Sequence, residues 1–288
     1  MIAITGATGA LGGEVARLLA DLSPRLVVRD PSRAPDLGGE VRQASYDDRP
    51  AAEAALDGVT TLLLVSAAES ATRREQHRTM VEAAAAAGVR HLVYTSFAGA
   101  GRESTFTLGR DHGDTEQAIR DAAARTGMTY TFLRDNFYAD VLPWFADASG
   151  VVRGPAGHGR LAAVARADVA DVAAVVLKAP EAHADVAYEL TGPEALTMAE
   201  VAARAGAVLG RDLRYEEETV AEAYASRRAA YPDAADYQLD AWVSTYTAIA
   251  DGSVSHVSGD VERLTGHPAR TLEEALASFP GQGSVADR

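Results

Sequence analysis

Short apolar runs alternate with longer amphipathic segments through the first half of the chain. The runs have strand length and lie at residues 1–5, 26–29, 61–66, 91–96 and 130–134, and residues 41–44 read as a further short strand. A helix follows the first run, and further helical segments lie at 50–56, 71–87 and 111–126. Strands that alternate with helices across short connections predict parallel strands covered by helices on both faces. The pattern therefore predicts an α/β fold with a doubly wound parallel sheet.

Glycines recur where the first apolar run passes into a helix. In a turn of this kind one glycine reverses the chain, one lets the backbone approach a phosphate, and one lets the helix pack on the strand. Backbone N–H groups and the positive helix end then face an anion, most often a pyrophosphate. The turn predicts a dinucleotide-binding Rossmann fold, and its cofactor-binding candidates are Gly6, Thr8, Gly9, Ala10, Leu11 and Gly12.

The ligand of a doubly wound sheet lies beyond the carboxyl ends of its strands. Residues that directly follow strands are therefore binding candidates, which adds Arg29, Ser66, Ser96 and the segment from Arg134 onward. At the end of the second strand, a carboxylate would bind the ribose 2′-hydroxyl, whereas a basic residue accommodates a 2′-phosphate. This strand ends in Arg29, with Arg33 four residues later, and Asp30 points to the opposite side of an extended chain. We expect NADPH as the cofactor; a solvated surface arginine is the alternative.

The alternation changes from about residue 150 onward. Short irregular strands are expected at 151–155 and 159–166, a helix at 168–177 with Asp168 as its N-cap, and a strand at 188–190. Thr197 and Glu200 fit a capping box, and helical segments dominate from there on. We expect residues 1–150 to form the NADP-binding Rossmann domain. Residues 151–288 are then a mixed segment that contributes to the sheet and forms a smaller, mainly helical substrate cap.

Composition excludes several classes of protein. The 288-residue chain has no cysteine, which excludes disulfides, thiolate metal sites and cysteine nucleophiles. Its net charge of −14 argues against nucleic acid or an anionic membrane as the main partner. No apolar run has the length of a membrane span and no leader precedes the first strand, so we expect a cytoplasmic protein. No spacing typical of a metal site or a serine hydrolase occurs, so no metal is expected.

A set of short segments carries a family resemblance: residues 5–12, 28–33, 62–69, 76–77, 93–96, 112, 115–116, 130–138, 165–168, 188–192 and 266–268. Together they resemble the NmrA-like atypical short-chain dehydrogenases/reductases. Within that family the chain is most similar to the branch of bacterial NADPH:quinone oxidoreductases and triphenylmethane-dye reductases. The resemblance covers essentially the whole chain.

The resemblance implies roles for residues near the cofactor. Residues 5–12 would wrap the pyrophosphate, and Arg29 would take the 2′-phosphate. The ribose side would be lined by Ser66, Ala67, Ala68 and Glu69. The nicotinamide end would be held by Asn136, Phe137, Tyr138 and Ala139, with Arg166 closing over the cofactor.

Two departures from the family pattern bear on substrate choice. The family usually has Arg-Asn-Gly-Trp-Tyr where this chain has Arg-Asp-Asn-Phe-Tyr at residues 134–138. It also favours an acid where Ser45 stands. Asp135 and Phe137 border the expected substrate space, so we count both among the substrate-binding candidates.

The usual catalytic pair of short-chain dehydrogenases is absent. That pair is Tyr-x-x-x-Lys, but the chain has a single lysine, Lys178, and none of its ten tyrosines precedes it by four residues. His112 and Glu116 instead share one helix face, and an imidazole backed by a carboxylate can deliver a proton near neutral pH. An ordinary helix ion pair or a histidine at the edge of the core is the alternative. Tyr138 is the third catalytic candidate.

A reductase of quinones or dyes needs little beyond a bound nicotinamide, an aromatic slot and exclusion of water. The slot is expected from Phe97, Phe106, Phe137, Tyr138 and Trp144, although aromatic residues are also ordinary core residues. The predicted function is an NADPH-dependent oxidoreductase that transfers hydride to a quinone or a related conjugated carbonyl, imine or dye. The alternatives are a non-catalytic, NADP(H)-binding redox sensor and a specialised biosynthetic reductase. The expected partner is a small aromatic or quinone-like acceptor, and a homodimer is allowed.

Overall fold

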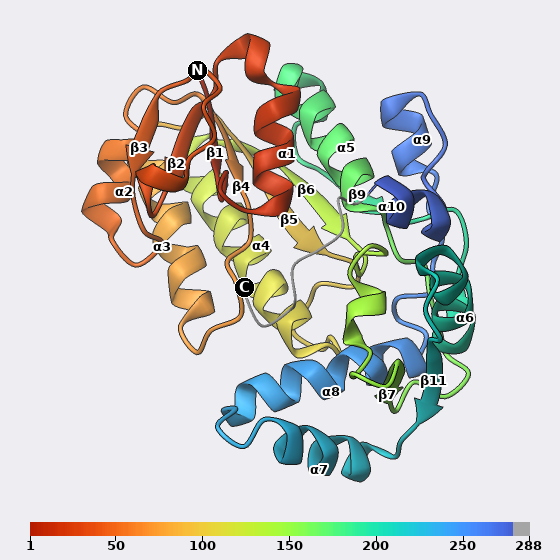
Figure 1. Ribbon diagram of the computed structural model, residues 1–288. Helices are drawn as coiled ribbons and strands as arrows, with labels where there is room; N and C mark the ends of the chain where they lie inside the picture. Colours follow the sequence, from red (N-terminus) through yellow and green to blue (C-terminus); the bar gives the residue numbers. More distant parts are fainter. Residues whose placement is uncertain (279–288) are drawn as a thin grey trace. The chain divides into compact units, whose positions relative to one another are not determined.

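The computed structural model describes residues 1–278, in which seven strands form one sheet in the order β3-β2-β1-β4-β5-β6-β9 (Figure 1). These strands are β1 Ile2–Thr5, β2 Arg25–Val28, β3 Val41–Gln43, β4 Thr61–Leu64, β5 His91–Phe97, β6 Thr129–Asp135 and β9 Val186–Leu190. The pairs from β3 to β5 are parallel. Because β1 lies between β2 and β4, the strand order reverses beside β1. The predicted doubly wound α/β fold is confirmed.

Helices cover both faces of this sheet (Figure 1). They are α1 Ala10–Leu18, α2 Arg49–Ala55, α3 Arg73–Ala86, α4 Thr107–Thr126 and α5 Arg166–Lys178. Helices α2, α3 and α4 lie on one face, and α1 and α5 lie on the other. On the first face Met80 of α3 and Ile119 of α4 join Leu62 and Tyr94 of the sheet in one buried cluster. The apolar strand residues are therefore buried between two helical layers, as their continuous runs predict.

The chain divides into two compact units that interleave in sequence. Unit 1 comprises residues 1–102, 109–134 and 169–189, and unit 2 comprises residues 103–108, 135–168 and the described residues from 190 onward. Unit 1 contains most of the sheet. The predicted division of the chain into domains at residue 150 stays a prediction.

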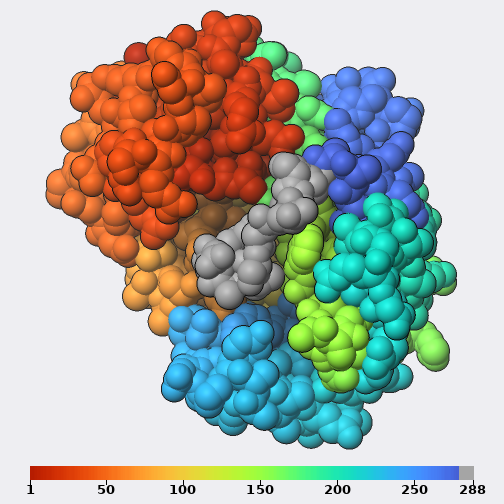
Figure 2. Space-filling model, viewed as in Figure 1, coloured from red at the N-terminus to blue at the C-terminus, as the bar shows by residue number. Residues whose placement is uncertain are grey.

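Unit 2 combines two short strand pairs with helices. β7 Val151–Gly154 pairs in parallel with β11 Arg214–Glu217, and β8 Arg160–Leu161 pairs antiparallel with β10 Leu196–Thr197. The helices are α6 Met198–Leu209, α7 Val220–Ala230, α8 Asp236–Ala250, α9 Asp260–Thr265 and α10 Leu272–Ser278. Helices α7 and α8 pack side by side and form one surface (light blue in Figure 2). In the part of the chain from 1 to 278, no helix is both long and apolar enough to cross a membrane.

A capping box marks the start of α6, whereas α5 begins earlier than predicted. The predicted capping box of α6 is present: Glu200 N donates to Thr197 Oγ1 at 3.2 Å, and Thr197 N donates to Glu200 Oε2 at 2.8 Å. Helix α5 begins at Arg166, two residues before the predicted start. Asp168 therefore lies in the first turn rather than at the N-cap, where its carboxylate accepts hydrogen bonds from Arg270. Short 3-10 helices occur at η1 Ala20–Leu22, η2 Pro31–Arg33, η3 Leu142–Phe145 and η4 Pro180–His183.

Candidate active site

Most cofactor-binding candidates of unit 1 gather at one edge of its sheet. Strands β1, β2 and β4 are neighbours and run in parallel, so their carboxyl ends meet there. Residues 6–12 follow β1, Arg29 follows β2, and residues 66–69 come two positions after β4. Ser96 lies close by at the end of β5, the next strand. The structure thus brings these candidates together at the edge where doubly wound sheets bind their ligands.

The glycine turn after β1 is closed so tightly that a side chain does not fit. Gly6 has a φ of +64°, which favours glycine, and Gly9 N donates to Gly6 O at 2.9 Å. A Cβ atom on Gly12 would lie 2.4 Å from Gly6 O, so only glycine lets α1 approach the turn this closely. The N-cap residue of α1, Gly9, has no side chain with which to cap the helix. Its first backbone N–H groups are therefore left for an anion, and the turn fits a pyrophosphate.

Arg29 and Asp30 at the end of β2 have different surroundings. The Arg29 side chain is exposed, as is that of Arg33 in η2. The Asp30 carboxylate caps η2: it accepts hydrogen bonds from the hydroxyl of Ser32 at 2.6 Å and from its backbone N–H at 3.0 Å. These hydrogen bonds lower the pKa of Asp30. Because the carboxylate is engaged in this cap, the site fits a 2′-phosphate on Arg29 better than a ribose hydroxyl on Asp30.

The segment after β4 is held by hydrogen bonds to four side chains, of which Thr95, His77 and Arg73 were not among the predicted site residues. Three consecutive backbone N–H groups donate to side chains: Val65 to Thr5 at 2.9 Å, Ser66 to Thr95 at 2.8 Å and Ala67 to His77 at 2.8 Å. Arg73 Nε also donates to Ala67 O at 2.9 Å. Two of these partners were visible as polar residues within buried apolar strands, Thr5 and Thr95. These contacts position residues 66–69, which are half-buried except for exposed Ala68.

His112 is a buried neutral imidazole with both nitrogens engaged. Arg73 Nη2 lies 3.0 Å from its Nε2, and the Tyr94 hydroxyl lies 2.9 Å from its Nδ1. Because a guanidinium only donates, Nε2 accepts and we assign the ring proton to Nδ1, facing Tyr94. Burial, followed by the charge of Arg73 and by His77, lowers the pKa of His112 well below its usual value. His112 therefore carries no spare proton near neutral pH.

Glu116 is bound by residues other than His112, so the predicted pair is not formed. Ser96 Oγ donates to Glu116 at 2.7 Å, Arg134 donates twice at 2.9 and 2.8 Å, and Arg120 donates at 2.9 Å. Burial alone would raise the pKa of Glu116, but the hydrogen bonds from Arg134 and Ser96 outweigh it and lower the pKa. The two guanidinium groups are stronger partners for a carboxylate than a neutral imidazole. They take the contact that the helical spacing had suggested for His112.

The side chain of Asn136, in unit 2, makes hydrogen bonds within the fold. Its Nδ2 donates to Val254 O at 2.9 Å, and its Oδ1 accepts from Phe137 N at 2.8 Å. The residue is buried. Ala139 N likewise donates to Val164 O at 2.8 Å. Asn136 and Ala139 therefore hold the backbone of the segment that carries Phe137 and Tyr138; direct cofactor contacts of this segment stay a prediction.

Tyr138 joins two carboxyl groups and an arginine within unit 2. Its hydroxyl lies 3.0 Å from Asp135 Oδ2, and the guanidinium carbon of Arg166 lies 5.3 Å from its ring centroid. Arg166 is buried and forms a 2.8 Å ion pair with Asp140. Burial raises the pKa of Asp135 well above its usual value, and burial followed by the neighbouring Asp135 raises the pKa of Tyr138. The Tyr138 residue itself is half-buried.

The aromatic candidates fall into separate groups. In unit 1, Phe97 stacks on His112 with ring centroids 6.1 Å apart. In unit 2, Phe137 meets Phe106 edge-on at 5.1 Å. Also in unit 2, the indole N–H of Trp144 donates to Asp140 O at 3.1 Å. An aromatic slot formed by these residues stays a prediction.

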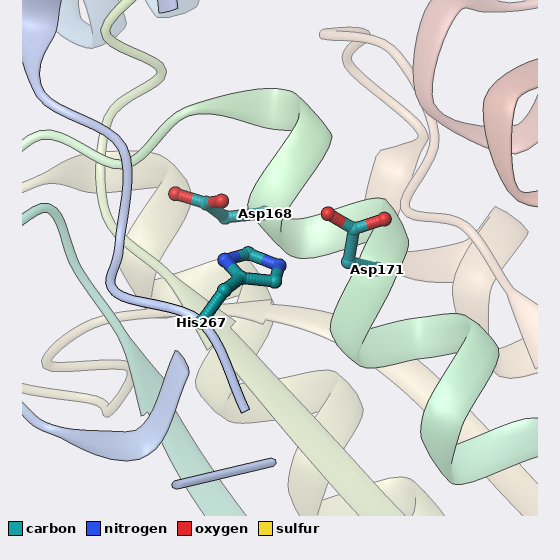
Figure 3. A group of neighbouring side chains, drawn as sticks. All are labelled: Asp168, Asp171 and His267. Carbon is teal, nitrogen blue, oxygen red and sulfur yellow. The ribbon is translucent and has the colours of Figure 1, made fainter. Parts of the chain in front are cut away.

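A pair of potential metal ligands has another explanation. Asp168 and His267 offer ligand atoms within 4.8 Å of each other (Figure 3). However, both carboxylate oxygens of Asp168 accept hydrogen bonds from Arg270, one from its backbone N–H at 2.8 Å and one from its guanidinium. This buried carboxylate is therefore neutralised by an arginine and serves to anchor the segment around Arg270.

Comparison with known proteins places this geometry in a family. The NmrA-like family matches residues 1–274. Quinone oxidoreductase 2 of Escherichia coli is 37% identical over 96% of this chain and 98% of its own length, and its structure with NADPH gives a TM-score of 0.86 at 35% identity, covering 96% and 99% of the two chains.

Two further relatives are equally extensive in coverage. A (4-alkanoyl-5-oxo-2,5-dihydrofuran-3-yl)methyl phosphate reductase of Streptomyces griseus is 38% identical over 95% of this chain and 96% of its own. The structure of Citrobacter sp. triphenylmethane reductase with NADP(H) gives a TM-score of 0.82 at 31% identity, covering 96% and 99% of the two chains. The predicted resemblance is confirmed: the chain belongs to the NmrA-like family.

Proposed function

We propose that this chain is an NADPH-dependent oxidoreductase that transfers hydride to a quinone or a related conjugated carbonyl, imine or dye. The observation that carries this proposal is the glycine turn at residues 6–12 beside Arg29, which fits a dinucleotide bearing a 2′-phosphate. It is supported by relatives named as a quinone oxidoreductase and a triphenylmethane reductase that resemble the chain over nearly its full length. NADPH, when bound, supplies the hydride.

The residues of the chain bind and orient rather than activate the acceptor. The first N–H groups of α1 hold the pyrophosphate, and Arg29 binds the 2′-phosphate. Thr95, His77 and Arg73 keep the segment after β4 in place. Residues 136–139 and Arg166 hold the nicotinamide end. A conjugated acceptor delocalises the charge that it gains, so the site needs no Tyr–Lys pair to lower the barrier.

A specialised biosynthetic reductase is the second candidate function. It is favoured by the relative from Streptomyces griseus, which is named for an oxo-dihydrofuran phosphate. Such a ring holds a carbon–carbon double bond conjugated with a carbonyl group. It therefore belongs to the same class of hydride acceptors as a quinone, and one panel of acceptors tests both candidates.

The test follows NADPH oxidation with a panel that contains a benzoquinone, a naphthoquinone, a triphenylmethane dye and an acylated butenolide. We expect turnover with at least one of them. Tight NADPH binding without turnover of any acceptor would contradict the enzyme and support a redox-sensing regulator instead. A preference for the butenolide of at least ten-fold in kcat/KM would favour the biosynthetic reductase.

The proposal also covers the partners and the location of the protein. The small-molecule acceptor fits the substrates for which the relatives are named. A homodimer, a cytoplasmic location and the lack of a nucleic-acid partner stay predictions.

A further inference from the structure

Asp135 is a buried carboxyl group that forms no ion pair with any residue that the structure describes. Its residue is 3% exposed. Within residues 1–278, its Oδ1 has no hydrogen-bond partner, and its Oδ2 lies 3.0 Å from the Tyr138 hydroxyl. Burial of an unpaired carboxylate is costly, and a group in this position keeps its proton instead. The Tyr138 hydroxyl is thus the polar group within hydrogen-bond distance of the Asp135 carboxyl group.

The charged groups near this pair are already matched with one another. Arg166 lies over the Tyr138 ring, but its guanidinium pairs with Asp140 at 2.8 Å. Arg134, the preceding residue in the chain, binds Glu116 and Glu189. The side-chain amide of Asn136, the following residue, donates to Val254 O and accepts from Phe137 N. None of these groups compensates a negative charge on Asp135.

We propose that Asp135 is held as a neutral carboxylic acid and passes its proton through Tyr138 to the reduced acceptor. This inference rests on the proposed reductase function. It adds a proton source for a site whose predicted donor, His112, is a neutral imidazole with both ring nitrogens engaged by Arg73 and Tyr94.

The step balances for a quinone. A quinone that has accepted a hydride is a hydroquinone monoanion and needs one proton. The Tyr138 O–H bond breaks as its proton moves to the hydroquinone oxygen, and the Asp135 O–H bond breaks as its proton moves to the tyrosine oxygen. The Asp135 carboxylate then regains a proton from water. No electrons pass through either side chain.

Asparagine, which the family usually has at this position, has the same shape as a neutral carboxylic acid but no acidic proton. The Asp135→Asn variant therefore keeps the packing and removes the proton. Asp121→Asn makes the same chemical change at an exposed carboxylate on α4 and serves as the matched control.

The first experiment needs no turnover. It measures the melting temperatures of the wild type, D135N and D121N, without cofactor, from pH 5 to pH 8. A raised pKa means that folded Asp135 binds its proton more tightly than the unfolded chain does, so wild-type stability falls as pH rises above the unfolded value of about 4. D135N escapes this loss. Its melting temperature relative to the wild type should rise by about 3 °C per pH unit until the pH passes the folded pKa. A difference that stays constant from pH 5 to pH 8 would overturn the proposal.

The second experiment compares two acceptors that differ in their need for a proton. A triphenylmethane dye cation becomes a neutral molecule when it accepts a hydride, whereas a quinone needs a proton as well. We expect D135N to lower the ratio of quinone to dye kcat by about 100-fold, at the lower end of the usual range for a general acid. Tyr138→Phe should lower the ratio similarly, and the double variant should show little further loss because both residues serve one route.

The outcomes separate this inference from the proposed function. If the wild type oxidises no NADPH with any acceptor, the proposed function fails and the proton delivery fails with it, whereas the melting temperatures still decide whether Asp135 holds a proton. If the wild type reduces the quinone and D135N leaves the ratio of quinone to dye unchanged, the proposed function stands and the proton route is refuted.

Discussion

Single side chains in this protein take their roles from the partners around them rather than from their residue type. His112 is a neutral acceptor because Arg73 donates to it, and Glu116 is an ionised anchor because two arginines bind it. Asp135 is paired with no cation in the described part of the chain. Folding therefore lowers the pKa values of His112 and Glu116 and raises that of Asp135. Arg29 is the exception, because its role depends on its place at a strand end.

The Arg29→Glu variant tests that role. It replaces a cation with an anion where the 2′-phosphate is expected. The Michaelis constant for NADPH should rise by about 30–100-fold, the value of a lost charge-assisted contact, while that for NADH should change by less than about 3-fold. Arg90→Glu makes the same change of charge at an exposed site as a control. Equal losses for NADPH and NADH would mean that Arg29 does not contact the 2′-phosphate.

The elements were predicted far better than the contacts between their side chains. The strands at 41–44, 61–66 and 91–96 end within two residues of β3, β4 and β5, since a strand-length segment between turn residues is a local property of the chain. The start of α5 was missed by two residues, because Asp168, which resembles an N-cap, binds Arg270 instead. A local pattern does not reveal a partner that lies 102 residues away.

The turn between β1 and α1 allows a prediction for an element. Gly12→Ala would place a Cβ atom 2.4 Å from Gly6 O and 2.9 Å from Thr5 O, which are backbone atoms that cannot rotate away. We expect the free energy of unfolding to fall by about 2–4 kcal/mol and NADPH binding to weaken, because α1 must move off the turn. Urea titration and fluorescence binding measure both effects.

Gly101→Ala is the matched control, since a Cβ atom there meets open space. Its stability should stay within about 0.5 kcal/mol of the wild type. A stable Gly12→Ala variant that binds NADPH normally would show that the turn is not closed as described.

At the scale of the whole molecule, unit 1 is tied together through one buried carboxylate. Glu116 of α4 binds Ser96 of β5 and Arg134 of β6, and Arg134 also binds Glu189 of β9 at 3.1 Å. Three strands of the sheet are therefore connected to α4 by polar contacts as well as by packing. Glu116, a predicted catalytic residue, and Ser96, a predicted cofactor contact, are thus joined in a structural hub.

The Glu116→Gln variant should lower the free energy of unfolding by about 2–4 kcal/mol, since it removes the charge partner of Arg120 and one of the two charge partners of Arg134. The pKa of Glu116 in the wild type is lowered by folding. The ionised carboxylate therefore stabilises the fold above about pH 4, and this contribution is lost as pH falls further. The deficit of the variant should therefore shrink in acid. Glu82→Gln, which removes a surface ion pair with Arg125, should cost less than about 1 kcal/mol at any pH. Similar deficits for both variants would argue against a hub at Glu116.

Periodicity, turn chemistry and the residue at a strand end are encoded within short stretches of chain. They were enough to predict the doubly wound sheet, the glycine turn for a dinucleotide and the preference for NADPH. His112 contacts Tyr94, Glu116 contacts Arg134 and Asn136 contacts Val254 across 18 to 118 residues of chain. Asp135 is buried, and within residues 1–278 its Oδ1 has no hydrogen-bond partner. Packing of distant elements decides such contacts, because a hydrogen bond or an ion pair forms with whichever group the fold brings within reach. The fold and the identity of the cofactor were therefore predictable from short stretches of sequence, whereas which side chain holds a proton depended on folding.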